Sequence, residues 1–181
     1  MTIADTYASL ARMLDYPVEK NGMQEAQSVV RAYLDEHHPD CSISSFAEFV
    51  NASPLAKLQE EYVATFDFNP ATAPYLGHHL FGDNQKKGGY MISLKQEFSR
   101  HDFIPAGREL PDHLSVVLAF LAHLTRSEDA TARSQFITNY VLPGLQRLNT
   151  AFAARRQSPW QVLVEVAEGL CIADCKEVTP C

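Results

Sequence analysis

Residues 108–121 read RELPDHLSVVLAFL, and this stretch decides the fold class most clearly. From Leu114 onward its apolar residues recur at spacings of three and four, which places them on one face of an α-helix. A half-buried strand would instead alternate apolar and polar residues, and that pattern is absent here. We therefore expect an amphipathic helix behind Pro111. Its apolar face consists of Leu114, Val117, Leu118 and Leu121.

The polar residues at the start of this helix are a candidate site. Pro111 suits the first turn, where its missing N–H costs nothing, and Asp112 complements the positive end of the helix dipole. His113 has no such structural explanation. An imidazole beside a carboxylate, with Arg108 and Glu109 just upstream, forms a polar cluster suited to peptide backbone or a guanidinium group. A structural and a functional interpretation of this cluster both stay open.

Helical spacing extends over nearly the whole chain. We expect the first helix to end near Asp15-Tyr16-Pro17 and the second at His37-His38-Pro39, because the residue before a proline avoids the helical region. Strand alternation is essentially absent throughout. The pattern predicts an all-α fold, a helical bundle of about nine or ten helices with short connections.

The exception is a segment rich in glycine and proline at residues 67–89. This composition favours irregular structure, and a long irregular segment inside a compact domain is usually functional or mobile. Neither half of the chain would have enough core alone, so we expect one all-helical domain over residues 1–181. The glycines and prolines of the segment are Pro70, Pro74, Gly77, Gly82, Gly88 and Gly89.

Composition excludes several classes of protein. Of 181 residues, 46% are hydrophobic and 20% charged, which excludes a disordered chain. The formal net charge of −7, without a Lys/Arg block, argues against partners such as nucleic acid or an anionic membrane. Apolar runs are far shorter than the ~20 residues of a membrane span, and the N-terminus lacks a basic signal region. We therefore expect a cytoplasmic protein.

The cysteines do not form the pattern of a secreted disulfide framework, because three of the four fall in the last eleven residues. Residues 171–181 are a candidate flexible tail. Cys171 and Cys175, four apart, could reach one metal ion with Cys181, but a closed zinc site needs a fourth ligand. A metal site, an oxidation-prone tail and inert thiols are the alternatives.

A metal-dependent helical phosphohydrolase is an alternative function. His101-Asp102 resembles the metal-binding dipeptide of that enzyme class, and His78 and His79 would be further ligands. The dipeptide, however, stands at the expected end of a helix rather than inside it. His37-His38 is interpreted as a pair of solvated loop histidines.

Four segments, in this order and spacing, are similar to one known family. They are LARMLDYP at 10–17, LQEEYVATFDF at 58–68, YLGHHLFGD at 75–83 and RELPDHLSVVLAFL at 108–121. The chain resembles the NarJ family of molybdoenzyme assembly chaperones, the nitrate reductase delta-subunit type, which is related to the TorD and DmsD chaperones. The resemblance runs from about residue 5 to about residue 170.

This resemblance implies a non-enzymatic chaperone. Its partner would be the N-terminal segment, a twin-arginine signal or its remnant, of a catalytic subunit of the DMSO reductase family. That client would receive molybdenum bis-guanine-dinucleotide cofactor, and an iron–sulfur cluster in some cases, while the chaperone binds no cofactor of its own. Cofactor-delivery proteins would be further partners, and the chain would be a monomer or weak homodimer. A structural subunit of a larger complex is the remaining alternative.

The resemblance also implies a peptide-binding site with named residues. Tyr62 and Phe66 would wall an apolar groove, with a place in the core as the alternative, favoured for Phe66. The segment with Tyr75 would close over the peptide. Asp112 would pair with an arginine, and His113 would orient it or bind peptide carbonyls. The full set is Tyr62, Phe66, Tyr75, His79, Leu80, Glu109, Asp112 and His113, with Glu61 as a further acidic candidate.

Overall fold

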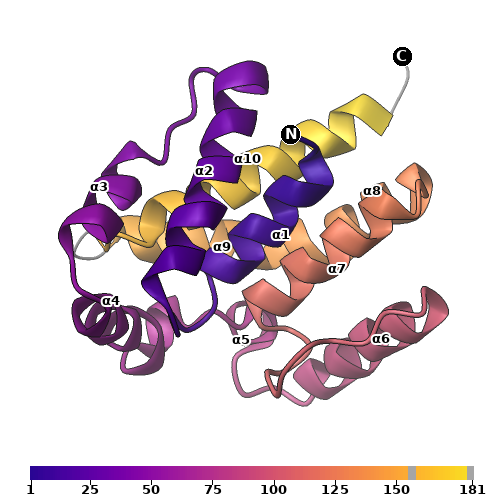
Figure 1. The fold of residues 1–181 in the computed structure, drawn as a ribbon. Coiled ribbons are helices and arrows are strands. Elements are labelled where there is room, and N and C mark those ends of the chain that lie inside the picture. Colours follow the sequence, from indigo (N-terminus) through magenta and orange to yellow (C-terminus); the bar gives the residue numbers. More distant parts are fainter. Residues whose placement is uncertain (155–157, 179–181) are drawn as a thin grey trace.

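The structure, a computed structural model, describes residues 1–154 and 158–178 and confirms the all-α class (Figure 1). The only β-type pairing in this part of the chain is an isolated antiparallel bridge between Tyr75 and His113. None of the helices described is long and apolar enough to cross a bilayer. In chain order the α-helices are α1 (Ile3–Met13), α2 (Lys20–His37), α3 (Ser44–Ala52), α4 (Leu55–Tyr62), α5 (Leu76–Phe81), α6 (Lys86–Arg100), α7 (Leu114–Arg126), α8 (Ala130–Phe136), α9 (Leu142–Ala153) and α10 (Gln161–Val178).

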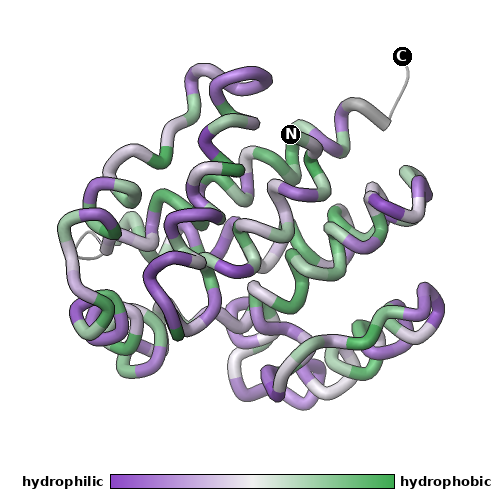
Figure 2. Tube along the Cα trace, viewed as in Figure 1, coloured by the Kyte–Doolittle hydropathy of each residue, from purple (hydrophilic) through white to green (hydrophobic). Residues whose placement is uncertain are grey.

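The centre of the fold is α1, which packs most extensively against α7 and α2. Green hydrophobic and purple hydrophilic positions alternate along the helices in Figure 2, as expected when one face of each helix is buried. In α7 the predicted apolar face is confirmed, because its four residues are completely buried. The predicted ends of the first two helices are confirmed within a few residues: α1 ends at Met13 and α2 at His37.

The prediction that residues 67–89 are irregular was only partly right. The segment contains the 3₁₀ turn η2 (Pro70–Thr72), the short helix α5 and the start of α6. Its glycines and prolines lie mostly at the ends of these short helices, which is why helical periodicity is not visible in the sequence. Gly82, between α5 and α6, has a φ of +55° that an L-residue rarely adopts.

Two further turns are π-helical: η1 (Val63–Asp67) continues α4, and η3 (Ile137–Val141) continues α8. A π-turn shifts the regular hydrogen bonding and leaves carbonyl groups available to other partners. Both turns use this property. Tyr90 Oη donates to the carbonyl of Tyr140 at 2.7 Å, and Thr72 Oγ1 donates to the carbonyl of Thr65 at 2.5 Å.

An aromatic cluster around Trp160 connects the start of α10 to the N-terminal helices. The indole ring is fully buried, and its N–H donates to the carbonyl of Met13 at 2.9 Å. Rings from α3, α4 and η1 surround it, with centroid distances of 5.4 Å to Phe46, 5.7 Å to Tyr62 and 6.3 Å to Phe66. The cluster therefore fixes the start of α10 against the N-terminal helices.

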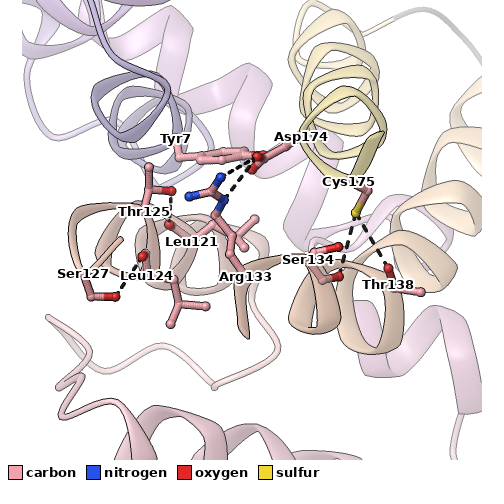
Figure 3. A network of polar contacts seen from close by, with 10 residues as sticks. All are labelled: Tyr7, Leu121, Leu124, Thr125, Ser127, Arg133, Ser134, Thr138, Asp174 and Cys175. Carbon is pink, nitrogen blue, oxygen red and sulfur yellow. Dashed lines mark hydrogen bonds and ion pairs between the residues drawn. The ribbon is translucent and has the colours of Figure 1, made fainter. Parts of the chain in front are cut away.

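The far end of α10 is fixed by a buried polar network (Figure 3). Asp174, 1% exposed, accepts hydrogen bonds from Arg133 Nη2 at 2.8 Å and Nε at 3.1 Å. Its second oxygen accepts from Tyr7 Oη at 3.0 Å. Burial raises the pKa of Tyr7, so its hydroxyl stays a donor. One carboxylate thus ties α1, α8 and α10 together.

The expectation of a flexible tail from residue 171 differs from the structure, because α10 continues to Val178. Cys171 is buried, and burial raises the pKa of its thiol. Cys175 is partly buried, with its sulfur 3.8 Å from the carbonyl of Ser134. Cys181 lies outside the described residues.

Candidate peptide-binding site

Two segments far apart in the sequence meet through backbone hydrogen bonds. Leu76 N–H donates to the carbonyl of Asp112 at 2.9 Å, and Leu114 N–H donates to the carbonyl of Pro74 at 2.7 Å. Between these bonds Tyr75 faces His113, and the two rings pack edge to face at a centroid distance of 5.1 Å. We call residues 74–77 and 109–114 the bridge region. It contains four of the eight predicted site residues, Tyr75, Glu109, Asp112 and His113, and two more, His79 and Leu80, lie on α5.

Asp112 lies beneath the surface and is completely buried. Its Oδ2 accepts the N–H of Gly77 at 3.1 Å, so it caps the first turn of α5 rather than of α7. Oδ1 is buried without a hydrogen-bond partner among the described residues, and burial raises the pKa of this carboxyl. The expectation that Asp112 pairs with an arginine of a bound peptide does not fit this position.

His113 is also buried, with 2% of its surface exposed. It is the N-cap of α7: its Nδ1 accepts the N–H of Ser115 at 3.2 Å, so the ring proton lies on Nε2. Burial lowers the pKa of His113, although the carboxylates of Glu109 and Asp15 oppose that shift. The imidazole is therefore neutral near pH 7. The ring packs against the inner side of Tyr75 and has almost no exposed surface that a peptide could contact.

Three exposed carboxylates lie near the buried imidazole of His113. Asp15, Asp67 and Glu109 are all exposed, and each is near enough to His113 to act against the lowering of its pKa. Glu109 accepts a hydrogen bond from Tyr75 Oη at 3.0 Å; burial, helped by Glu109, raises the pKa of Tyr75 to about 12. We call Asp15, Asp67 and Glu109 the acidic rim. Asp15 and Asp67 were absent from the predicted site, because nothing in the sequence places them beside Glu109.

Tyr62 and Phe66 belong to the core, with 3% and 1% of their surfaces exposed. Tyr62 Oη donates to the carbonyl of Leu14 at 3.3 Å, and both rings contact Trp160. In this structure they therefore do not wall an open groove. Their spacing of one helical turn correctly indicated a shared apolar face, but that face packs inward.

The remaining predicted residues lie on α5. His79 is half-buried and its Nε2 donates to the carbonyl of Ala73 at 2.7 Å; burial lowers the pKa of its imidazole. Leu80 is half-buried against the core. Tyr75, which immediately precedes α5, is the predicted aromatic residue that keeps a partly open surface beside the acidic rim.

A cleft of about 670 Å³ adjoins the rim, and its mainly apolar lining also includes Lys95, Asp102 and Arg108. It lies between the last turns of α6 and residues 102–111, and Phe98 and Phe103 contribute to its lining. At the edge of the cleft Ile104 is 89% exposed and Leu110 is 48% exposed, so apolar surface is open to solvent there. Because Glu109 lines both the cleft and the rim, the two form one continuous surface with an acidic and an apolar part.

We predict that Gly77→Ala destabilises the protein while Gly88→Ala stabilises it. A Cβ at Gly77 would lie 2.8 Å from Oδ2 of Asp112, so the cap must move, at a cost of about 1–3 kcal/mol in the free energy of unfolding. A Cβ at Gly88, in α6, meets nothing within 4 Å, and alanine gains about 0.5–1 kcal/mol of helix propensity there. Urea denaturation measures both changes. Equal stabilisation by the two substitutions would contradict the close contact between Gly77 and Asp112.

The residues of the alternative hydrolase site do not assemble. In the described part of the chain, no group of three or more His, Cys, Asp or Glu side chains is arranged to hold a metal ion. His101 and Asp102 follow the end of α6, as expected, and the carbonyl of His101 accepts a hydrogen bond from His123 Nε2 at 2.7 Å. His78 and His79 are neighbours on α5.

The comparisons with known proteins point to one family. A family model described as the nitrate reductase delta subunit matches residues 35–163. A Bacillus subtilis (strain 168) protein named "Probable nitrate reductase molybdenum cofactor assembly chaperone NarJ" is 29% identical over 72% of this chain and 70% of its own length. The nitrate reductase molybdenum cofactor assembly chaperone NarJ of Escherichia coli (strain K12) is 29% identical over 66% of this chain. The alignment spans 52% of that relative, about half its length.

Among solved structures, the fold is similar to that of a candidate redox enzyme maturation protein from Archaeoglobus fulgidus. The TM-score is 0.61 with 16% sequence identity, and the superposition covers 93% of both chains. At this identity the likeness concerns the fold. It supports the all-helical architecture over nearly the whole chain.

Proposed function

Since the chain belongs to the nitrate reductase delta subunit family, we propose that it binds the N-terminal segment of a molybdoenzyme catalytic subunit and holds that subunit for cofactor insertion. The Bacillus subtilis and Escherichia coli relatives described above are named assembly chaperones, and the chain is assigned to the same non-enzymatic class. The molybdenum cofactor belongs to the client. We place the protein in the cytoplasm, where a client would be held before complex assembly or export.

The observation that supports this proposal is the continuity of the acidic rim and the apolar cleft. A segment that carries arginines next to an apolar stretch would place its guanidinium groups at Asp15, Asp67 and Glu109 and its apolar side chains near Ile104 and Leu110. Helices and extended peptides commonly dock in this way, with apolar anchors in a groove and charges at its edge. Electrostatic complementarity favours this partner over others.

The direct contacts proposed here therefore differ from those that the sequence resemblance implied. Tyr75, His79, Leu80 and Glu109 stay in the proposed site, because Glu109 is exposed and the other three are partly open. Four predicted residues are buried under this surface and have a structural role: Asp112 and His113 hold the bridge region in place, and Tyr62 and Phe66 belong to the core.

We predict that the double variant Asp67→Asn, Glu109→Gln weakens binding of the client peptide by about tenfold, or about 1.4 kcal/mol. Two exposed carboxylates would each lose an interaction with arginine that is modest in water. Isothermal titration calorimetry with a peptide of the catalytic subunit's N-terminal segment measures the change, and higher salt should reduce the difference.

The matched control combines Glu36→Gln with Asp40→Asn, two exposed carboxylates in the last turn of α2 and in the connection between α2 and α3. It carries the same loss of charge away from the bridge region, so we expect unchanged affinity. If the control weakened binding as much as the double variant, net charge rather than the acidic rim would be responsible. If neither variant changed the affinity, the rim would not be the binding site.

A further inference from the structure

The short helix α5 is held at both ends by charged side chains from distant parts of the chain. At its start, Asp112 accepts hydrogen bonds from the first two N–H groups of the helix. The backbone carbonyl of Asp112 accepts from Leu76 N–H at 2.9 Å, and its Oδ2 accepts from Gly77 N–H at 3.1 Å. At its end Arg147 Nη1 donates to the carbonyls of His79 and Leu80, both at 3.0 Å. Helix ends leave four N–H and four C=O groups without internal partners, so these are the groups that need such contacts.

The signs of the two charges suit the helix. A carboxylate lies at the N-terminal end, where the helix dipole is positive, and a guanidinium lies at the C-terminal end, where it is negative. A helix of this length is not stable without tertiary contacts. The position of α5, and of Tyr75 directly before it, therefore depends on tertiary contacts, which are the burial of Leu76 and the two charged contacts at the helix ends.

Close packing brings Arg147 to this place. Gly144, one turn earlier on α9, lies so near α5 that a Cβ there would be 2.9 Å from Cβ of Leu76. The same face of α9 then presents Arg147 to the last turn of α5. Within residues 1–154 and 158–178, Arg147 forms no ion pair, so the carbonyls of α5 are its polar contacts there.

We infer that Arg147 is a positioning residue for the peptide site: by holding the end of α5 it fixes Tyr75, and through the hydrogen bond from Tyr75 it fixes Glu109 in the acidic rim. This inference rests on the proposed function. Arg147 was not among the residues predicted from the sequence, because its partners are backbone carbonyls, which no motif reveals.

The test compares two peptides and four proteins. The peptides are the client's N-terminal segment and the same segment with its arginines replaced by glutamine. The proteins are wild type, Arg147→Met, Arg147→Lys and, as a control, Arg126→Met, which removes another exposed arginine, one that pairs with Asp5. The quantity measured by calorimetry is the ratio of the two dissociation constants for each protein.

We expect wild type and Arg126→Met to prefer the arginine peptide by about tenfold, and Arg147→Met to prefer it by about threefold or less. Arg147→Lys, which keeps a cationic donor at the end of α5, should restore most of the preference. The ratio separates positioning from general destabilisation, because a partly unfolded population lowers the apparent affinity for both peptides by the same factor. Faster amide hydrogen exchange at Gly82, whose N–H bonds the carbonyl of His78, should accompany the loss in Arg147→Met.

The outcomes are distinct. A full arginine preference in Arg147→Met, with wild-type behaviour otherwise, would overturn the positioning role and leave the proposed function standing. A wild-type protein that bound neither peptide would overturn the proposed function and this inference with it. A wild-type protein that bound both peptides equally would overturn the role of the acidic rim and this inference, and would leave the proposed function standing.

Discussion

Trp160→Ala is expected to lower the free energy of unfolding by about 3–5 kcal/mol, because it empties the centre of the aromatic cluster. The indole is fully buried and touches rings from α3, α4 and η1, and alanine would also leave the carbonyl of Met13 without its donor. Urea denaturation followed by circular dichroism measures the loss. Trp160 is the only tryptophan of the chain, so fluorescence cannot report on this variant.

The control for this prediction is Val18→Ala. Val18 is 76% exposed, so its truncation should change the free energy of unfolding by no more than about 0.5 kcal/mol. A loss below about 1 kcal/mol in Trp160→Ala would show that the cluster does not hold α10 to the N-terminal helices.

Asp174→Ala is expected to cost about 3–5 kcal/mol as well, for an electrostatic reason. The substitution leaves the Arg133 guanidinium, 12% exposed, without its counter-charge, and it leaves Tyr7 Oη without its acceptor (Figure 3). Removing one member of a buried ion pair is costly mainly because the other charge stays buried. Urea denaturation at fixed pH measures the change.

A double-mutant cycle separates this explanation from simple loss of packing. In Arg133→Met, Asp174→Leu both charges are replaced by apolar groups, so stability should return towards that of wild type. If the double variant were as unstable as Asp174→Ala, the penalty would come from the shape of the site rather than from an unpaired charge.

The sequence predicted the helices well because each helix buries one face, and that face repeats at a spacing visible over a few turns. The α7 stretch shows this most clearly, since its predicted apolar face is fully buried. The sequence did not predict α5 as a helix. Six residues are too few for periodicity, and the contacts that hold α5 come from Asp112 and Arg147, far away in the chain.

The residues of the candidate site could be predicted from the sequence only in part, because some of their contacts come from distant parts of the chain. Glu109, Asp112 and His113 were identified from their unusual combination, and Tyr75 from the family resemblance, and the structure places Tyr75 against His113. Burial could not be inferred, however. A carboxylate at a helix start is usually solvated, whereas Asp112 is buried because a second helix begins against it.

The Tyr7–Asp174–Arg133 network had no signal in the sequence at all. Tyr7 fits an apolar helix face, and Asp174 occupies a position that would be equally suitable for a solvated residue. Their partnership depends on packing between α1 and α10 over a separation of 167 residues. Such long-range polar pairs become visible only once the fold is known.

Amide hydrogen exchange of the protein with and without the client peptide tests the central claim most directly, because it locates the bound segment. We predict slower exchange in the described residues 67–80 and 102–114, which carry the bridge region, two of the three residues of the acidic rim and most of the cleft lining, and no change in α2 and α3. Protection confined to α2 and α3, or no protection at saturating peptide, would contradict the proposed peptide-binding site.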